Sequence, residues 1–322
     1  MDSHSTMLLT QSEVRAVLDM KAAVAAVEEA FRSHGRQEAV MPPKVYLPIE
    51  RYGGDFRAMP GFLGRAAGVK WISSFPNNPV QNRLPAVIGL FVLSHPATAR
   101  PLAVMDATAL TGFRTGAAAA VATKHLRASA PKRIGLIGAG AQAATILEAH
   151  RVVFGDSLEA VVADVSRPNA ESFAMQHDAT PGSLEDASGC DVVCTATPSR
   201  QPIVVREWVQ KGAHINAMGA DAPGKQELDP QLLREAFLVV DDVHQATASG
   251  EVNVPLRDGM LSEEEIDATL GEIVAGRRAA PRGATLTIFD STGLAIQDVA
   301  LAKAAYDIAR ERRMGLRIDF SH

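Results

Sequence analysis

The chain has 322 residues, enough for about two domains, and with 47% hydrophobic and 21% charged residues it has the balance of a folded globular protein rather than a disordered or fibrous one. Its formal net charge of −5 offers no basic excess for nucleic acid or anionic membranes, so we expect neither partner. No apolar run approaches the roughly 18 residues of a membrane span and Met1–His4 lacks signal-peptide features, so we expect a cytoplasmic protein.

Two helices are predicted near the N-terminus. Thr10 and Glu13 have the spacing of a capping box, and apolar residues at helical spacing follow them. A second helix is predicted from Lys21 to Gly35, because its apolar residues form one stripe. From Met41 the pattern changes to β-like runs punctuated by Pro and Gly, which predicts one mostly antiparallel sheet. These runs are Lys44–Leu47, Gly68–Ile72, Val87–Leu93 and Leu102–Met105.

An Ala-rich helix, Ala117–Leu126, leads into a region where short apolar runs alternate with helical patterns. This alternation predicts a parallel sheet with crossover helices, and the apolar content fits strands covered on both faces. The predicted strands are Arg133–Gly138, Leu158–Val165, Asp191–Thr197, His214–Gly219, Phe237–Asp242 and Thr285–Phe289. A last helix, Ala295–Arg313, is expected to pack on the first domain.

The predicted fold class is therefore α/β, with a Rossmann-type doubly wound parallel sheet over residues 120–293. Residues 1–119 and 294–322 are predicted to form a second, discontinuous α+β domain.

A dinucleotide fingerprint follows the strand that begins at Arg133. Gly138 permits a tight turn, Gly140 lets the backbone approach a pyrophosphate, and the small Ala143 lets helix and strand pack closely. Asp164 ends the next strand at the spacing expected of an acid that binds a ribose 2′-OH, which favours NAD over NADP. Arg167 could instead accommodate a phosphate. Alternatively, the glycines merely close a turn and Asp164 caps the loop after its strand.

Four cations lie in apolar or Gly/Pro-rich surroundings of the first domain and need anionic partners: Lys44, Arg57, Lys70 and Arg114. The fork of an arginine matches a carboxylate, and a lysine adds a point charge. Like charges and desolvation beside Trp71 should lower the pKa of Lys70, which suits proton transfer. Asp221 follows a predicted strand, so it should lie at the carboxyl edge of the sheet, where ligands of such folds bind.

Seven segments across nearly the whole chain resemble the ornithine cyclodeaminase/μ-crystallin superfamily, and most closely its archaeal-type alanine dehydrogenases. They are Met41–Leu47, Arg57–Pro60, Leu102–Thr108, Arg114–Ala118, His214–Asn216, Gly219–Asp229 and Ile288–Asp298. The resemblance implies an NAD-linked homodimer that converts L-alanine to pyruvate and ammonia, with Lys70 and Asp221 catalytic and Arg57 and Lys44 holding the carboxylate. It also implies a cofactor site formed by Arg114, Gly138, Gly140, Ala141, Gln142, Asp164, Thr195, Lys225 and Ser291.

Three other functions fit the same superfamily: reduction of a cyclic imino acid such as Δ1-pyrroline-2-carboxylate, cyclodeamination of ornithine, and binding of NAD(P)H and a small ligand without turnover. A cation at Arg57 makes ornithine less suitable, because cyclodeaminases tend to hold an acid there. The acid at Asp221 favours a reaction in which water adds to the imine, over imine reduction alone or ligand binding without turnover. No histidine spacing indicates a metal site, and Cys190 and Cys194 read as buried core thiols. Gln297 and Asp298 could serve structure or function equally.

Overall fold

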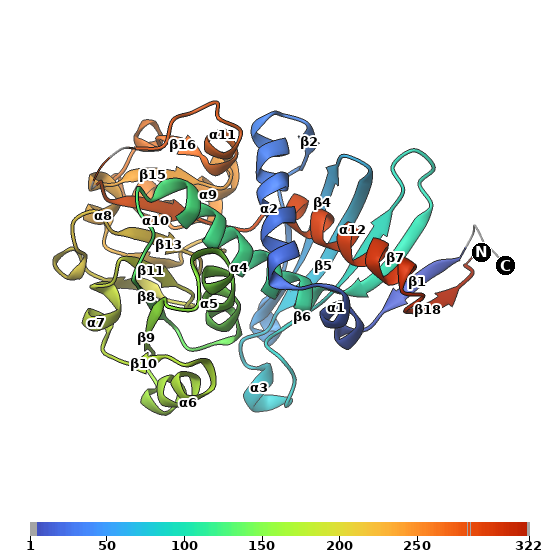
Figure 1. Ribbon diagram of the computed structural model, residues 1–322, viewed down its shortest axis with the longest axis horizontal. Helices are drawn as coiled ribbons and strands as arrows, with labels where there is room; N and C mark the ends of the chain where they lie inside the picture. The colour runs from blue at the N-terminus through green and yellow to red at the C-terminus, as the bar shows by residue number, and fades with distance from the viewer. Residues whose placement is uncertain (1–4, 282, 284, 321–322) are drawn as a thin grey trace. The chain divides into compact units, whose positions relative to one another are not determined.

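The computed structural model divides into two compact units, a first unit of Met1–Arg114 with Leu294–His322 and a second of Thr115–Gly293 (Figure 1). The structure describes residues 5–281, 283 and 285–320. Met1–His4, from which we expect no signal peptide, lies outside this part. Within the described part of the chain, no helix is both long and apolar enough to cross a membrane.

An eight-stranded sheet forms the first unit. Its strands are β1 (Thr6–Leu9), β2 (Ala39–Val40), β3 (Val45–Ile49), β4 (Gly54–Leu63), β5 (Ala66–Ser74), β6 (Val87–Ser94), β7 (Pro101–Asp106) and β18 (Leu316–Ile318). They pair in the order β18–β1–β7–β6–β5–β4–β2, and β3 also pairs with β4. Only β1 and β7 run parallel among these pairs, which confirms the predicted, mostly antiparallel sheet.

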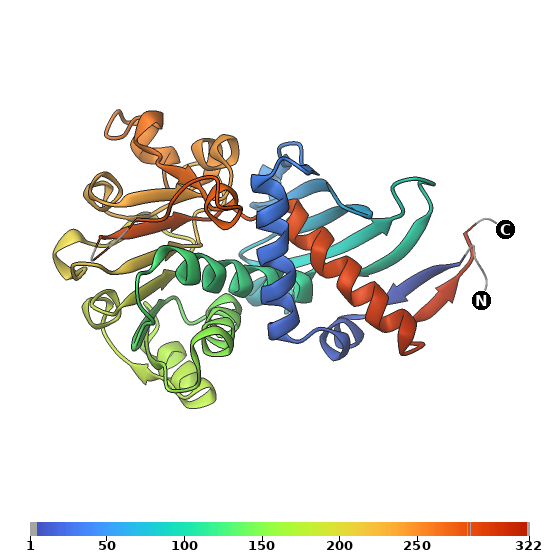
Figure 2. The same ribbon diagram turned by 45° about the horizontal axis from the view of Figure 1, so that its top comes forward.

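Helices cover one face of this sheet. They are α1 (Gln11–Val17), α2 (Met20–Gly35) and α12 (Ala295–Glu311), and the short α3 (Asn78–Gln81) lies in the connection between β5 and β6. The capping box is confirmed: the Thr10 side chain accepts a hydrogen bond from the backbone of Glu13, and the Glu13 carboxylate accepts one from the backbone of Thr10. Figure 2 shows α12 lying beside α2 and along the sheet, and its contacts are with α2, β4 and β5. The last helix therefore packs on the first unit, as predicted.

The two faces of this sheet differ in cover rather than in polarity. Alternate residues point to opposite faces of a strand. On the helix side Met59, Ile72 and Phe91 are buried. On the other side large apolar residues remain exposed, with Trp71 at 46% and Leu90 at 53% of their full accessible surface. The exposed apolar face consists of Val45, Leu47, Trp71, Ile88 and Leu90.

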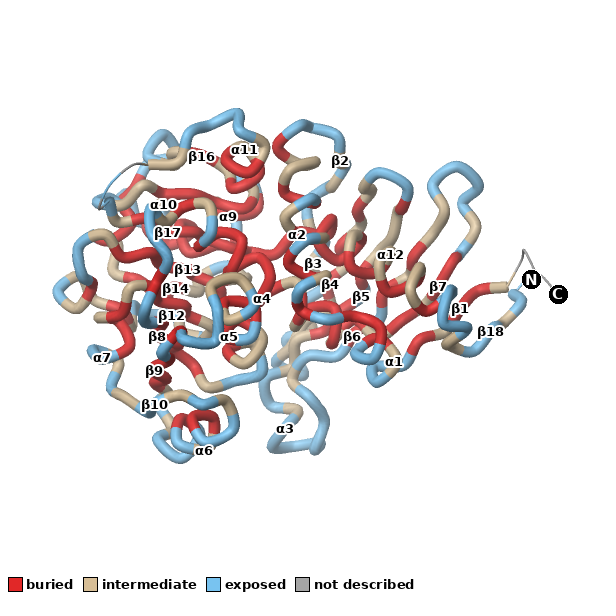
Figure 3. Tube along the Cα trace, in the orientation of Figure 1, coloured by how far each residue is buried: buried red, intermediate tan, exposed pale blue. Residues whose placement is uncertain are grey.

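A second eight-stranded sheet forms the other unit, and Figure 3 shows most of its strands as buried. Its strands are β8 (Arg133–Ile137), β9 (Glu159–Ala163), β10 (Thr180–Pro181), β11 (Val192–Thr195), β13 (His214–Ala217), β15 (Phe237–Val240), β16 (Ala268–Thr269) and β17 (Thr287–Asp290). All neighbours are parallel, in the order β10–β9–β8–β11–β13–β17–β15–β16. The order reverses between β8 and β11, so the sheet is doubly wound, as predicted.

The crossovers of this sheet are mostly helical. The helices are α5 (Ala141–Phe154), α6 (Arg167–His177), α7 (Leu184–Ser188), α8 (Pro230–Glu235), α9 (Val243–Ser249), α10 (Asn253–Arg257) and α11 (Leu270–Val274). A small parallel pair, β12 (Arg200–Val204) with β14 (Gln226–Leu228), stands apart from the main sheet. Cys190 and Cys194 are buried and unpaired, as predicted for core thiols.

One predicted helix begins earlier than expected. The helix predicted at Ala117–Leu126 is α4 (Ala107–Leu126), because the Asp106 carboxylate accepts a hydrogen bond from the backbone of Ala109 at 2.7 Å and caps the helix start. Gly116 lies inside the helix where α5 crosses: a Cβ there would come within 2.2 Å of the Thr145 carbonyl oxygen. Glycine at this position therefore reflects close packing between helices and not a helix boundary.

Candidate active site

The predicted fingerprint forms the turn from β8 into α5. Gly138 has a φ of +100°, and a Cβ there would lie 2.9 Å from the Ala196 carbonyl oxygen, so the turn requires glycine. Gly140 is the N-cap residue of α5, no side chain caps this end, and a Cβ on Gly140 would meet no atom within 4 Å. No side chain therefore satisfies the N–H groups at the start of the helix, which suits a phosphate. Gly140 and Ala141 also border a surface cavity of about 250 Å³.

Asp164 follows β9 and reaches this turn. Its carboxylate accepts hydrogen bonds from the backbone of Ala139 and of Ser166, both at 2.8 Å. The predicted cap of the loop is therefore present, and the same carboxylate lies against the fingerprint where a ribose hydroxyl would bind. Arg167, the residue that could accommodate a 2′-phosphate, instead forms an exposed ion pair with Glu171 at 2.8 Å.

Three more predicted cofactor residues lie in the second unit near the carboxyl ends of its strands or at a helix start. The Thr195 hydroxyl, at the end of β11, is buried and donates to Glu227 at 2.6 Å. The Ser291 hydroxyl, after β17, donates to Asp241 at 3.4 Å. The side-chain amide oxygen of Gln142 (Oε1), in the first turn of α5, is buried without a hydrogen-bond partner in the described structure. A buried amide oxygen without a partner needs a donor from a ligand or water.

The first unit holds a fully buried ion pair. Lys70 on β5 is 1% exposed and Asp298 in the first turn of α12 is 0% exposed. The Lys70 Nζ lies 2.7 Å from an Asp298 carboxylate oxygen and 3.5 Å from the Thr111 hydroxyl oxygen. Two charges removed from water in this way require close partners, since an unpaired one would be strongly destabilising. The pair therefore fixes the Lys70 ammonium on the inner face of the sheet.

The surroundings of Lys70 lower its pKa to about 8. Burial is the largest cause, Asp298 opposes it, and the positive charges of Arg114 and Arg57 lower the pKa further. The predicted direction is correct, but one predicted cause is wrong. Trp71 adjoins Lys70 in the chain and points to the opposite face of the sheet, so it does not desolvate the lysine.

Arg57 lies on the inner face of β4, near the buried lysine. Its guanidinium donates to Asp55 at 2.6 and 3.3 Å and stacks over the ring of Tyr46, its cross-strand partner, at 5.3 Å from the ring centre. Both contacts hold the planar group in one orientation. Lys44 stands just before β3 and is half-buried. Arg114 lies in α4, and its Nε is buried without a hydrogen-bond partner in the described structure.

Asp221 and Lys225 pair with each other in the second unit. The Lys225 Nζ donates to Asp221 at 2.6 Å and to the Gly219 carbonyl oxygen at 3.4 Å. Both belong to the loop that follows β13, residues 219–225. The structure thus gathers the predicted residues into two sets: the four cations in the first unit, and the cofactor residues with Asp221 in the second.

Two carboxylates that were not predicted as site residues lie beside the predicted ones. The sequence left a structural and a functional role for Asp298 equally open, and the structure shows it as the ion partner of Lys70. Glu227 had no predicted role, and it is the acceptor for Thr195. A buried acid in a segment that already matches a family pattern is the signal that could have found both.

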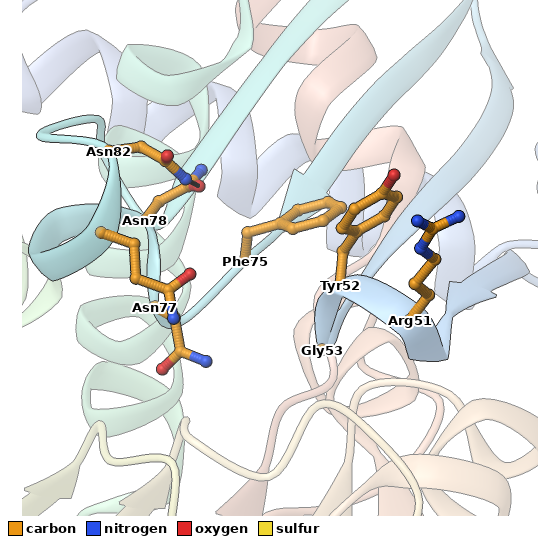
Figure 4. A pocket seen from close by; sticks show the side chains of 8 residues that line it. Arg51, Tyr52, Gly53, Phe75, Asn77, Asn78 and Asn82 are labelled. Carbon is orange, nitrogen blue, oxygen red and sulfur yellow. Dashed lines mark hydrogen bonds between the residues drawn. The ribbon is translucent and has the colours of Figure 1, made fainter.

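Figure 4 shows a separate pocket of about 420 Å³ in the first unit, close to the turn before α3. Asn77, Asn78 and Asn82 face Phe75 and Tyr52 across it, with Arg51 at its rim. Arg51 and Tyr52 are the only ionisable residues that line it. None of the predicted site residues line this pocket, so it has no part in the acid–base chemistry.

The sequence matches the Ornithine cyclodeaminase/mu-crystallin family over residues 4–313, and the chain belongs to that family. It is 48% identical to an alanine dehydrogenase of Archaeoglobus fulgidus, over 98% of both chains. It superimposes with a TM-score of 0.95 on an archaeal alanine dehydrogenase dimer with bound NAD, at 48% identity over 98% of this chain and 99% of that one.

A reductase also lies close in structure. The Thermococcus litoralis Δ1-pyrroline-2-carboxylate reductase, solved with NADH and L-proline, has a TM-score of 0.92 and is 34% identical over 97% of this chain and all of that one. The fold is thus shared by relatives that act on an open-chain amino acid and by relatives that act on a cyclic imine.

Proposed function

We propose that this member of the family is an NAD-dependent alanine dehydrogenase, which oxidises L-alanine to pyruvate and ammonia and catalyses the reverse reductive amination. The observation that carries the proposal is the buried Lys70, held by Asp298 with Arg57 and Arg114 close by. This arrangement supplies positive charge for a small carboxylate beside an amine whose pKa of about 8 lies near the working pH. Among the relatives, the Archaeoglobus fulgidus enzyme supports the choice of substrate.

Each residue of the first unit has a distinct task. Arg57, oriented by Asp55 and Tyr46, binds the substrate carboxylate with its planar fork, and Lys44 adds a second positive charge. Lys70 moves a proton to or from the substrate and, as the ammonium, polarises the oxygen that becomes the keto group. These contacts hold the Cα of alanine in one orientation, which is the main contribution of binding residues to rate.

The second unit provides the cofactor site and the acid for water chemistry. NAD, when bound, would supply the hydride acceptor, and the residues of the second unit that would hold it are the fingerprint, Gln142, Asp164, Thr195, Lys225 and Ser291. Release of ammonia requires water to add at Cα, and Asp221 accepts the proton of that water. Lys225 orients the Asp221 carboxylate through their ion pair.

The assay that tests this function measures oxidation of NADH by purified protein with pyruvate plus ammonium, and with Δ1-pyrroline-2-carboxylate in parallel. We expect turnover of pyruvate that depends on ammonium and is faster with NADH than with NADPH. Turnover of the cyclic imine alone would replace the proposal with an imine reductase. Absence of turnover with both, together with NADH binding, would indicate a ligand-binding protein.

The second candidate is the cyclic imine reductase, because the Thermococcus litoralis structure shares the fold so closely. Reduction of an imine needs a proton donor such as Lys70 but no water addition. Asp221, set at the strand edge and paired with Lys225, has a function only where water is added or lost. This residue therefore favours the dehydrogenase.

Coenzyme preference should depend on Asp164. We expect Asp164→Ser to raise the KM for NAD about tenfold, because a hydrogen bond from a ribose hydroxyl to a charged acceptor is lost. The KM for NADP should fall or stay constant, because the repulsion of a 2′-phosphate is removed. Steady-state kinetics with both coenzymes measure the change. Equal losses with NAD and NADP would contradict the ribose contact and leave Asp164 as a loop cap.

We infer that the enzyme is a homodimer whose first units meet through the exposed apolar face. A contiguous exposed patch on a sheet, formed by Val45, Leu47, Trp71, Ile88 and Leu90, is typical of a surface that a partner covers. The dimer of the archaeal relative with 48% identity supports this assembly. The two unpaired cysteines suit a reducing compartment, and we propose the cytoplasm.

Charge on this face should break the dimer. We expect Leu90→Asp to shift the protein from dimer to monomer at micromolar concentration, since burial of each leucine contributes about 1.5–3 kcal/mol and a buried unpaired carboxylate costs more. Sedimentation velocity measures the mass. Val152→Asp, at an exposed valine on α5 in the second unit, is the matched control and should stay dimeric. A dimeric Leu90→Asp would place the interface elsewhere.

A further inference from the structure

We propose that the buried Glu227, together with Asn253, is a positioning residue that ties the ends of β11 and β13 together and fixes the loop 219–225, which carries Asp221. The inference rests on the proposed function. According to this proposal, two side chains outside the predicted site hold the catalytic loop in one conformation.

Glu227 collects hydrogen bonds from two different strand ends. One oxygen accepts from the Thr195 hydroxyl at 2.6 Å and from the Gly219 backbone at 2.9 Å. The other accepts from the Thr197 backbone and from the Thr197 hydroxyl, both at 2.7 Å. Thr195 ends β11, Thr197 lies two residues beyond it, and Gly219 begins the loop after β13. A single side chain therefore fixes both loops that border the expected nicotinamide side of the cofactor site.

The geometry demands a carboxylate at this position. Each of its two oxygens accepts one backbone N–H, from Thr197 on one side and from Gly219 on the other. An amide has only one acceptor oxygen, so glutamine in either orientation would place its NH2 group against a backbone N–H. The site is fully buried, so water cannot replace the lost acceptor.

The packing against Gly219 is equally close. A Cβ on Gly219 would come within 2.5 Å of a Glu227 oxygen, so the loop backbone rests directly on the carboxylate. Any movement of Glu227 is therefore passed to the residues that follow Gly219. Asp221 lies two residues further along the chain.

Asn253 holds the other end of the same loop. Its side-chain oxygen accepts a hydrogen bond from the Gly224 backbone at 2.9 Å, and its NH2 group donates to the carbonyl oxygen of Lys225 at 3.0 Å and to that of Gly250. The loop is thus fixed at Gly219 by Glu227 and at Gly224–Lys225 by Asn253. Asp221, between these two points, pairs with Lys225 at 2.6 Å.

This arrangement explains how a half-buried loop keeps a catalytic acid in place. Loops gain precision from buried hydrogen bonds beneath them, and a displacement of about 1 Å at a reacting group can cost 10²-fold in rate. Thr195 belongs to the same hydrogen-bond network. Its hydroxyl donates to Glu227, so Thr195 contributes to the cofactor site by fixing the conformation of the strand end.

The test compares Glu227→Gln with Glu251→Gln in the full-length enzyme. Glu251 is equally buried, and one of its oxygens accepts from the backbone of Glu227 at 2.8 Å and of Leu228 at 2.7 Å. Its other oxygen has only a longer contact of 3.1 Å with the same Glu227 N–H, so glutamine with its amide oxygen in the first position keeps the two shorter bonds. We expect Glu227→Gln to raise the dissociation constant for NADH, measured by nucleotide fluorescence, about tenfold and to lower kcat for pyruvate amination by at least as much. Glu251→Gln should keep the wild-type value of both.

The outcomes separate a positioning role from a structural one. If Glu227→Gln melts at a lower temperature but keeps the wild-type dissociation constant and kcat, the proposal is overturned. If Glu227→Gln does not fold, Thr197→Val removes one donor and should raise the dissociation constant about threefold, and no change would overturn the proposal. A wild-type protein that neither binds NADH nor reduces pyruvate would instead refute the proposed function.

Discussion

Replacement of Lys70 by methionine should lower kcat for alanine oxidation by about 10³-fold, because general acid–base catalysis contributes 10²–10⁴-fold. Methionine matches the lysine stem in length but leaves the buried Asp298 without its ion partner, so the melting temperature of the variant is measured alongside kcat. The affinity for NADH, which binds through the second unit in our proposal, should change by less than about twofold. Steady-state kinetics and nucleotide fluorescence measure the two effects.

A matched control is available on the surface of the same unit. Lys303 on α12 forms an ion pair with Asp307 at the surface, so Lys303→Met removes a lysine charge without touching the buried pair. We expect its kcat to equal that of the wild type. If Lys70→Met retained activity within a few-fold, proton transfer would have to belong to another group, and the assignment of Lys70 would be wrong.

Local patterns of the sequence were sufficient for much of the fold. The capping box at Thr10 and Glu13, the fingerprint turn at Gly138 and the six strands from Arg133 onward depend on neighbours within a few residues, and the structure places all of them. The short strand β1 was not predicted: four residues, Thr6–Leu9, show too little alternation, and pairing with β7 and β18 makes them a strand.

Contacts between distant segments explain what the sequence did not reveal. Lys70 and Asp298 are far apart in the sequence, and only the packing of α12 on β5 brings their charges together. Glu227 receives donors from β11 and β13, which are adjacent only in the folded sheet. The insertion of β17 between β13 and β15 also follows from crossover paths and not from local pattern.

Strand geometry explains why Trp71 was the wrong cause for the lowered pKa of Lys70. Consecutive residues of a strand point to opposite faces, so Trp71 could not desolvate its neighbour Lys70. The charged residues that do act on the lysine come from other elements: Arg57 is on the neighbouring strand β4, Arg114 on α4 and Asp298 on α12. The alternation of side chains along the predicted strand would have excluded Trp71 as a cause of the pKa shift. It could not have identified Asp298 as a neighbour of Lys70.

The charge of Asp298 should set the pH at which Lys70 works. Alanine oxidation needs neutral Lys70, so kcat/KM of the wild type should rise with pH through about 8. Asp298 is the group that raises this pKa, while burial, Arg114 and Arg57 lower it. Asp298→Asn removes only the raising influence, so the rising limb should move to lower pH, by one unit or more if the pair contributes about 1.4 kcal/mol or more.

Comparison of the two profiles isolates the lysine, because the ammonium group of free alanine titrates identically with both enzymes. The maximal kcat should also fall, by about 10²-fold, since Lys70 loses the partner that fixes its Nζ. Amination of pyruvate provides the opposite sign: it needs protonated Lys70, so its falling limb should move to lower pH in the same variant. A limb that stayed at the wild-type position in both directions would mean that Asp298 anchors α12 without controlling the charge of Lys70.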